Sequence, residues 1–183
     1  MNSFFNTYYK IAMCLLFLVS GSLAVSSAHA ESFYGELNTG YSFTKLDDEQ
    51  FNPITLEARL GMYIQQQVGV EAYYATGVSD DTQFNIDLAI NTAAGLNFRF
   101  ESIESDGMKI MILLGYGMTE WDLDRSGTGA PGKVDFDDFN YGAGFEWRLG
   151  KSKNWFINLR GQRYLNKHDL TLDMGSLGVR YVF

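Results

Sequence analysis

Apolar and polar residues alternate with a period of two along most of the chain after residue 30. In one long example, Leu96, Phe98 and Phe100 are separated by Asn97 and Arg99. This period is typical of a β-strand with one apolar face, and no helical repeat or apolar run long enough for a membrane helix accompanies it. The pattern predicts eight strands, over residues 33–43, 54–64, 68–74, 87–100, 108–118, 139–149, 155–162 and 170–183.

The alternation changes phase at two places. One lies at Gly175-Ser176 and the other lies between Phe136 and Phe139. Because one extra residue in a strand shifts the side chains to the opposite face, each phase change predicts a β-bulge.

The connections between the predicted strands differ in length at alternate positions. Residues 65–67, 101–107 and 150–154 form the shorter set, and residues 45–53, 77–85, 122–133 and 166–169 form a mostly longer and more acidic set. Alternate connections of an up-and-down barrel lie at opposite ends, and membrane barrels have short periplasmic turns and longer extracellular loops. The sequence therefore predicts an all-β fold, an eight-stranded antiparallel up-and-down transmembrane β-barrel.

The polar faces of the strands carry charges of both signs together with many glycines. Small residues suit the interior of an eight-stranded barrel, and buried charges need partners of opposite sign. We therefore expect a polar network in the lumen, made of Glu36, Glu57, Arg59, Glu71, Asp87, Arg99, Lys109, Glu146, Arg148, Arg160 and Arg180.

Aromatic residues recur near both ends of the apolar faces, as in the girdles at the two interfaces of a membrane barrel. The short-turn end has Phe33, Phe98, Phe100, Trp147, Trp155, Tyr181 and Phe183, and the long-loop end has Tyr41, Phe43, Tyr74, Trp121 and Phe139. A soluble barrel with its apolar face inward is the alternative that the alternation alone leaves open.

Residues 1–30 have the pattern of a cleavable secretory signal peptide. Lys10 precedes the apolar run 11–19, and a small-residue segment ends in Ala28 and Ala30, which fit a cleavage site. The apolar run is too short for a membrane anchor. We therefore expect residues 31–183 to form the mature barrel domain.

The last strand ends in a recognisable pattern, formed by Ser176, Gly178, Tyr181 and Phe183. It resembles the C-terminal signal of bacterial outer-membrane barrels, which the barrel-assembly machinery reads. With the signal peptide and eight strands, residues 31–183 resemble the small outer-membrane β-barrel family, which includes opacity-type proteins and barrels similar to outer membrane proteins A and X. The resemblance implies location in the outer membrane, in contact with its lipid and lipopolysaccharide.

The composition and the remaining motifs give little sign of catalysis. The net charge of −8 excludes a nucleic-acid binder that works through bulk charge, and a single Cys excludes a disulfide scaffold. His168 has no serine aligned with it as a catalytic pair would need. The segment from Asp122 to Gly127 resembles the first half of a calcium loop, but Lys133 stands where a bidentate Glu is required. We expect no catalytic residue, no metal site and no cofactor.

The long connections hold most of the acidic excess, in Asp47, Asp48, Glu49, Asp80, Asp81, Asp122, Asp124, Asp135, Asp137 and Asp138. Such loops either bind an extracellular ligand or form a solvated rim. The sequence favours a non-enzymatic barrel with a closed polar lumen and a structural or surface-interaction role. A small porin-like channel, a lipid A-modifying enzyme and a soluble periplasmic ligand-binding barrel are the alternatives.

Overall fold

The computed structural model describes residues 32–46, 49–79, 81–83, 86–125, 132–167 and 170–183. The residues from Glu31 to Phe183 form one compact unit. Within the described ranges, no helix is long and apolar enough to cross a bilayer. The predicted signal peptide, including Ala28 and Ala30, lies outside the described residues.

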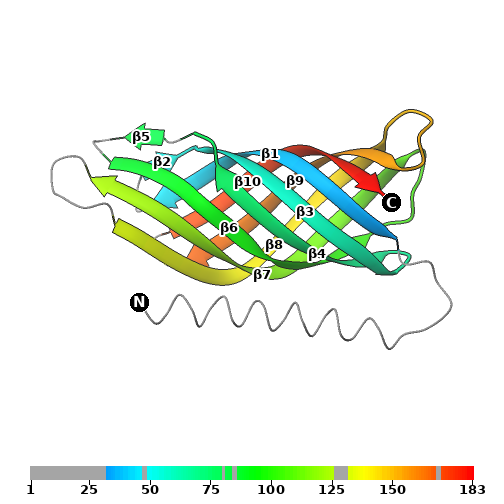
Figure 1. The fold of residues 1–183 in the computed structure, drawn as a ribbon, viewed down its shortest axis with the longest axis horizontal. Coiled ribbons are helices and arrows are strands. Elements are labelled where there is room, and N and C mark those ends of the chain that lie inside the picture. The colour runs from blue at the N-terminus through cyan, green and yellow to red at the C-terminus, as the bar shows by residue number, and fades with distance from the viewer. Residues whose placement is uncertain (1–31, 47–48, 80, 84–85, 126–131, 168–169) are drawn as a thin grey trace. The chain divides into compact units, whose positions relative to one another are not determined.

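Eight long antiparallel strands form most of the described part of this unit (Figure 1). They are β1 (Phe33–Leu46), β3 (Ile54–Gln65), β4 (Val68–Gly77), β6 (Ile86–Glu101), β7 (Met108–Arg125), β8 (Gly132–Arg148), β9 (Trp155–Lys167) and β10 (Leu170–Val182). The short strands β2 (Glu49–Phe51) and β5 (Asp81–Gln83) pair with β1 and β6 beyond the main sheet. Each long strand pairs with the next, and β10 pairs with β1, which closes the sheet. The predicted eight-stranded antiparallel barrel is confirmed.

The strand register fixes the tilt of the barrel. Following paired residues once around the sheet from Phe43 returns to β1 at Phe33, ten residues lower, through Asp173, Arg163, Tyr141, Leu114, Phe98, Val70 and Met62. With about 3.3 Å per residue and about 4.7 Å between strands, this shift tilts the strands by about 40°. Each residue therefore adds about 2.5 Å of height along the barrel axis.

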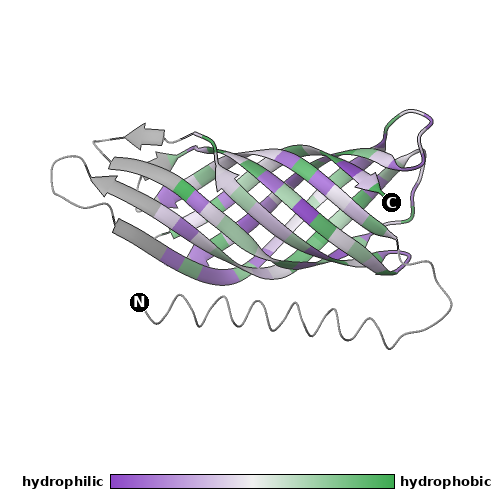
Figure 2. Ribbon diagram, in the orientation of Figure 1, coloured by the Kyte–Doolittle hydropathy of each residue, from purple (hydrophilic) through white to green (hydrophobic). Residues whose placement is uncertain are grey.

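Apolar side chains cover the outside of the barrel, and hydrophobic and hydrophilic positions alternate along each strand (Figure 2). Leu37 and Leu60 are 64% and 70% exposed, whereas Glu36 and Arg59 beside them are buried. A soluble barrel would have the opposite arrangement. The aromatics predicted for the two girdles are exposed or half-buried on this outer face, with Trp121 as the exception.

Trp121 is 1% exposed and lies inside the barrel, so its predicted place in the outer girdle is wrong. Ile90, Leu170, Leu172 and Met174, which lie at apolar positions of the predicted strands, are also buried, and Ile90 lies at a register shift of β6. The reason is that the interior is apolar at the end of the barrel that carries the long loops. Alternation alone cannot distinguish an apolar lumen from an apolar outer wall.

The same apolar interior explains the two phase changes. The pairing of β10 with β1 continues without a shift through Gly175 and Ser176, and β8 pairs with β7 without a shift around Phe136. The predicted bulges are therefore absent from both places: the lining changes from polar to apolar, while the strand keeps its phase. Register shifts occur instead at Ile90/Thr92, Leu172/Asp173 and Tyr63/Gln65.

Candidate functional site

The candidate site is the lumen, where strands β1, β3, β4, β6, β8, β9 and β10 place charged side chains that alternate with the outward apolar ones. Arg59 on β3 forms the centre of one group. Its Nε and Nη2 donate to the two carboxylate oxygens of Glu57 at 2.7 and 2.8 Å, and Nη1 donates to Glu71 on β4. All three side chains are fully buried. A fork of this kind satisfies both charges, which a buried ion pair requires.

Arg99 on β6 forms the centre of a second group nearer the short-turn end. Its Nε donates to Glu101 at 2.6 Å, its Nη2 donates to Glu146 on β8, and its Nη1 lies 3.3 Å from Glu36. Arg180 on β10 joins the same group, because it pairs with Glu146 and with Glu101. These contacts tie β6, β8 and β10 together across the lumen.

Arg160 on β9 connects the two groups. It forms an ion pair with Glu36 on β1 and has a nitrogen 3.9 Å from both Glu57 and Glu71. Its side chain is fully buried. The three carboxylates around it therefore have cations on more than one side.

Tyrosines and amides donate to carboxylate oxygens that the arginines also bind. Tyr34 donates to Glu71 at 3.0 Å, Tyr63 donates to Glu101 at 2.5 Å and Tyr164 donates to Glu57. Amide groups donate in the same way, from Asn38 to Glu57 and from Asn97 to Glu71 at 3.1 Å each. Arg59 also lies over the ring of Tyr73, 5.1 Å from its centroid, and Arg180 lies 5.1 Å from that of Tyr34.

An apolar cluster fills the lumen on the long-loop side of this network. It is buried and consists of Phe51, Tyr73, Ala75, Ile90, Ala93, Trp121, Tyr164, Leu165, Leu170, Leu172 and Met174, with Phe136 packed against it. Tyr73 and Tyr164 belong to both layers: their rings meet edge to face at 5.4 Å, and their hydroxyl groups take part in the polar network. The lumen therefore has two consecutive fillings, one ionic and one apolar.

The described charges of the network balance. Five buried carboxylates, of Glu36, Glu57, Glu71, Glu101 and Glu146, face four buried guanidinium groups, and Lys109 at the rim donates to Glu101 at 2.9 Å. Every one of these carboxylates contacts a cation. Such an arrangement stabilises a filled interior, because unpaired charges would carry a large desolvation cost.

The structure brings together eight of the lumen residues proposed from the sequence: Glu36, Glu57, Arg59, Glu71, Arg99, Glu146, Arg160 and Arg180. Lys109 and Arg148 lie at the short-turn mouth, where Arg148 pairs with Glu104. Asp87 belongs to β6, but its side chain lies outside the described part of the chain.

Sequence reasoning missed several members of the network. Glu101 was assigned to a turn, yet β6 extends through it and directs it inward. Tyr164 sits where β9 is offset from β10 by one residue, beyond the predicted end of the strand. The alternation of Arg160, Gln162 and Tyr164 is a signal that could have extended that strand.

The four residues of the terminal pattern divide between the two faces. Ser176 and Gly178 point into the lumen, whereas Tyr181 and Phe183 lie on the outer side, with ring centroids 5.1 Å apart. A Cβ on Gly178 would overlap the side chain of Asn38 and lie 2.5 Å from the carbonyl oxygen of Leu37. This position needs glycine so that β10 can close against β1.

Two predicted features of the loops cannot be located. His168 lies outside the described residues, as do Ser126 and Gly127 of the calcium-like segment and the side chains of Asp122 and Asp124. Among the residues whose side chains are described, no three His, Cys, Asp or Glu are grouped as a metal site requires.

Several solved outer-membrane proteins have the same fold. The attachment invasion locus protein Ail of Yersinia pestis, in complex with the heparin analogue sucrose octasulfate, is 18% identical, with a TM-score of 0.63 over 85% of this chain and 100% of Ail. Neisserial surface protein A is 13% identical, with a TM-score of 0.63 over 82% and 97% of the two chains. OprG of Pseudomonas aeruginosa is 14% identical, with a TM-score of 0.58 over 84% and 96%.

Sequence comparison gives a complementary result. No curated protein matches the chain. The family model described as "Outer membrane protein beta-barrel domain" matches residues 15–183. Together with the closed barrel and its apolar outer wall, this match shows that the chain belongs to the outer membrane protein β-barrel family and resides in the outer membrane.

Proposed function

We propose that this protein is a non-enzymatic barrel with a closed lumen, which holds its acidic loops at the cell surface for a structural or surface-interaction role. The observation that carries the proposal is the double filling of the lumen, by the ion network and by the apolar cluster. An eight-stranded barrel is just wide enough for side chains to fill it. This filling argues against the porin-like alternative.

The chemistry of the network argues against the lipid A-modifying alternative. Catalytic carboxylates need access to a substrate, and those of Glu57, Glu71 and Glu146 are fully buried and bound by arginines. An enzyme acting on lipid A would also need its reactive groups near the outer wall, where apolar side chains predominate. The network therefore suits a stabilising role.

The surface role rests on charge. The long connections are strongly acidic, and Asp135 and Asp137 near the start of β8 are exposed. Complementary charge steers association, so we expect a basic partner. The ligand in the Ail structure is a polysulfate, and acidic loops would repel a ligand of that kind.

Two measurements test the proposal. Mass spectrometry of lipid A from cells with and without the gene should give identical spectra, and a modification that depends on the gene would contradict the non-enzymatic role. A lysine-rich peptide should bind the purified barrel in zwitterionic nanodiscs, and its affinity should fall with salt and when Asp47, Asp48 and Asp135 are changed to Asn. Equal affinity for this variant and the wild type would contradict a surface role through acidic loops.

A further inference from the structure

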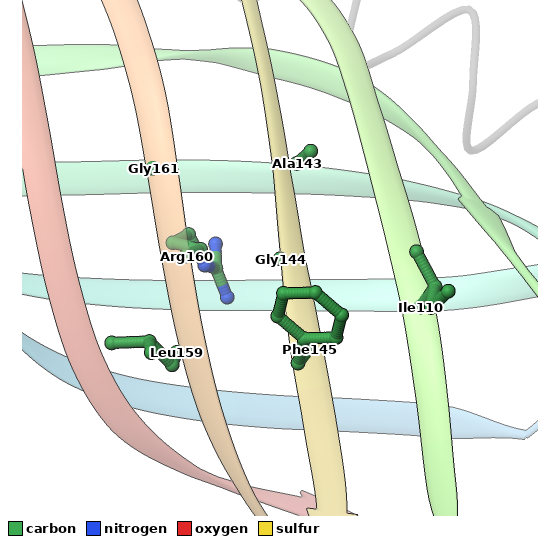
Figure 3. A pocket seen from close by; sticks show the side chains of 7 residues that line it. All are labelled: Ile110, Ala143, Gly144, Phe145, Leu159, Arg160 and Gly161. Atoms are coloured by element: carbon green, nitrogen blue, oxygen red, sulfur yellow. The ribbon is translucent and has the colours of Figure 1, made fainter.

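A hollow of about 380 Å³ lies on the wall formed by β7, β8 and β9 (Figure 3). Its lining comprises Ile110, Ala143, Gly144, Phe145, Leu159, Arg160 and Gly161. Ala143 and Gly161 are paired across β8 and β9, and a Cβ added to Gly161 would meet no atom within 4 Å. The hollow exists because these two small outward residues stand side by side, and a third, Gly175 on β10, is paired with Gly161 as well.

The sides of the hollow are apolar and open to the outside of the barrel. Ile110, Phe145 and Leu159 are 46%, 43% and 48% exposed. Gly144 and Arg160 alternate with these outward positions and form its floor. The volume lies within the range of about 300 to 1,000 Å³ that is usual for ligand sites. The hollow is therefore an apolar groove that is continuous with the lipid-facing surface.

The groove belongs to the periplasmic half of the membrane. Gly161 is six residues from Trp155, where β9 begins at the short-turn end. At about 2.5 Å of height per residue, Gly161 lies about 15 Å above Trp155, which is about half of the 30 Å hydrocarbon layer. An acyl chain that enters from the periplasmic interface would thus reach the groove about 10 to 15 Å above Trp155, between Leu159 and Gly161.

The turn between β8 and β9 lies on the periplasmic side of the groove, four residues or about 10 Å below Leu159, and is basic. It carries Lys151 and Lys153, both exposed, and residues 149–154 include no acidic residue. Gly150 adopts a φ of 61°, which allows the tight turn that presents the two lysines. Trp147 and Trp155 flank the turn on the outer face, 40% and 44% exposed. Two cations next to two interfacial tryptophans suit an anionic headgroup.

We propose that the groove and this turn together bind one anionic phospholipid of the periplasmic leaflet. An acyl chain would occupy the groove, and Lys151 and Lys153 would bind the phosphate of the headgroup. The proposal rests on the membrane-embedded barrel described above. It adds the leaflet, the headgroup class and the residues that select them.

The charge of the turn and the height of the groove in the bilayer favour an anionic phospholipid over two other possible occupants. A second copy of the chain docked on the same wall would bring two pairs of lysines together, which repel each other. A lipid of the outer leaflet has its headgroup at the opposite interface, beyond the far end of the groove. An anionic lipid of the periplasmic leaflet matches both the apolar groove and the basic turn.

Tryptophan fluorescence provides a direct test in the intact barrel. Brominated phospholipids quench the tryptophans that they touch, and Trp147 and Trp155 are the exposed ones beside the site, whereas Trp121 is buried in the lumen. The folded barrel is inserted into phosphatidylcholine vesicles that contain increasing amounts of brominated phosphatidylglycerol or brominated phosphatidylcholine. Because one lysine near an anionic lipid is worth about fivefold in binding, we expect brominated phosphatidylglycerol to bind at least about fivefold more tightly.

Three variants assign the preference to the site. Gly161→Leu fills the groove, and the double variant Lys151→Gln/Lys153→Gln removes the cations, so both should reduce the preference toward one. Gly35→Leu is the matched control: Gly35 is an outward glycine on β1 near the same interface, with room for a Cβ at 3.6 Å from Leu60. This control should keep the wild-type preference. A slower-migrating species after heating, on a gel, verifies that each variant is folded.

Each other outcome overturns the proposal. A wild-type barrel that does not discriminate between the two lipids has no anionic-lipid site. A preference that survives in Gly161→Leu, or is lost equally in Gly35→Leu, places the site elsewhere. Loss of quenching at high protein density would indicate that a second copy of the chain occupies the groove. Loss of quenching on addition of lipopolysaccharide would indicate that an outer-leaflet lipid occupies it. In all these cases a heat-modifiable, folded wild-type barrel leaves the proposed function intact.

Discussion

Arg59 and Glu57 lie on the same face of β3 and form a two-pronged ion pair in the lumen, with N–O distances of 2.7 and 2.8 Å. Both side chains are fully buried. The pair is joined by Glu71, Gln162 and Tyr164, so Arg59 connects β3 with β4 and β9.

Removal of this central cation should destabilise the barrel strongly. Arg59→Met leaves the carboxylates of Glu57 and Glu71 buried without the nearby positive charge of Arg59. Breaking such a buried ion pair costs about 3–5 kcal/mol of folding free energy. Arg148→Met is the control, because Arg148 pairs with Glu104 at the partly exposed mouth, where a pair contributes about 0–1 kcal/mol. Urea unfolding in lipid vesicles measures both. Equal effects for the two variants would contradict the network's role in stability.

The interior position of Trp121 can be checked by its fluorescence. In the variant Trp147→Phe/Trp155→Phe, Trp121 is the only tryptophan left among the 3 in the sequence. We expect neither acrylamide in the water nor brominated lipid in the membrane to quench its fluorescence, because Trp121 is 1% exposed and packs in the apolar cluster. Quenching by the lipid would place Trp121 on the outer wall instead.

The apolar cluster should contribute as much to stability as the network. Trp121→Ala removes its largest fully buried side chain, and a truncation of that kind costs about 3–5 kcal/mol. Phe139→Ala is the control, since Phe139 is 74% exposed on the outer wall. In urea unfolding, the loss in free energy of unfolding should be several-fold larger for Trp121→Ala than for Phe139→Ala. A smaller loss for Trp121→Ala than for Phe139→Ala would contradict a packed apolar layer.

Alanine variants of Gly178 and Gly175 compare a position in β10 where packing requires glycine with one where a larger residue has room. Gly178→Ala should lower the folded fraction on a heat-modifiability gel, because its Cβ would overlap Asn38. Gly175→Ala should fold like the wild type, since a Cβ there meets no atom within 4 Å. Normal folding of Gly178→Ala would show that β10 can close against β1 without glycine at this position.

Phe183 tests the proposed assembly signal. Phe183→Ala should slow insertion into the outer membrane in a pulse-chase experiment, while the folded protein, once formed, keeps its stability. Phe33→Ala is the control at the same end of the barrel, where Phe33 is 53% exposed and its carbonyl accepts the N–H of Phe183. Identical insertion rates for Phe183→Ala and the wild type would remove Phe183 from the signal.

The sequence was sufficient to predict the strands and the polar half of the lumen, because charged residues such as Glu57 and Arg59 can only face inward in a membrane barrel. It was insufficient for the other half. Trp121 and Leu172 alternate as lipid-facing residues do, and only the strand register shows that they share a face with Arg180 and Glu146. Glu101 was missed for a different reason, since the end of a strand is set by its pairing with neighbours and not by its own residues.

The account's central claim is that the lumen is closed, and single-channel recording in planar bilayers tests it most directly. The folded wild-type barrel should give no discrete conductance steps, because the ion network and the apolar cluster fill the lumen in succession. Reproducible steps from the wild-type protein, with a size that scales with salt concentration, would contradict the claim and favour a channel.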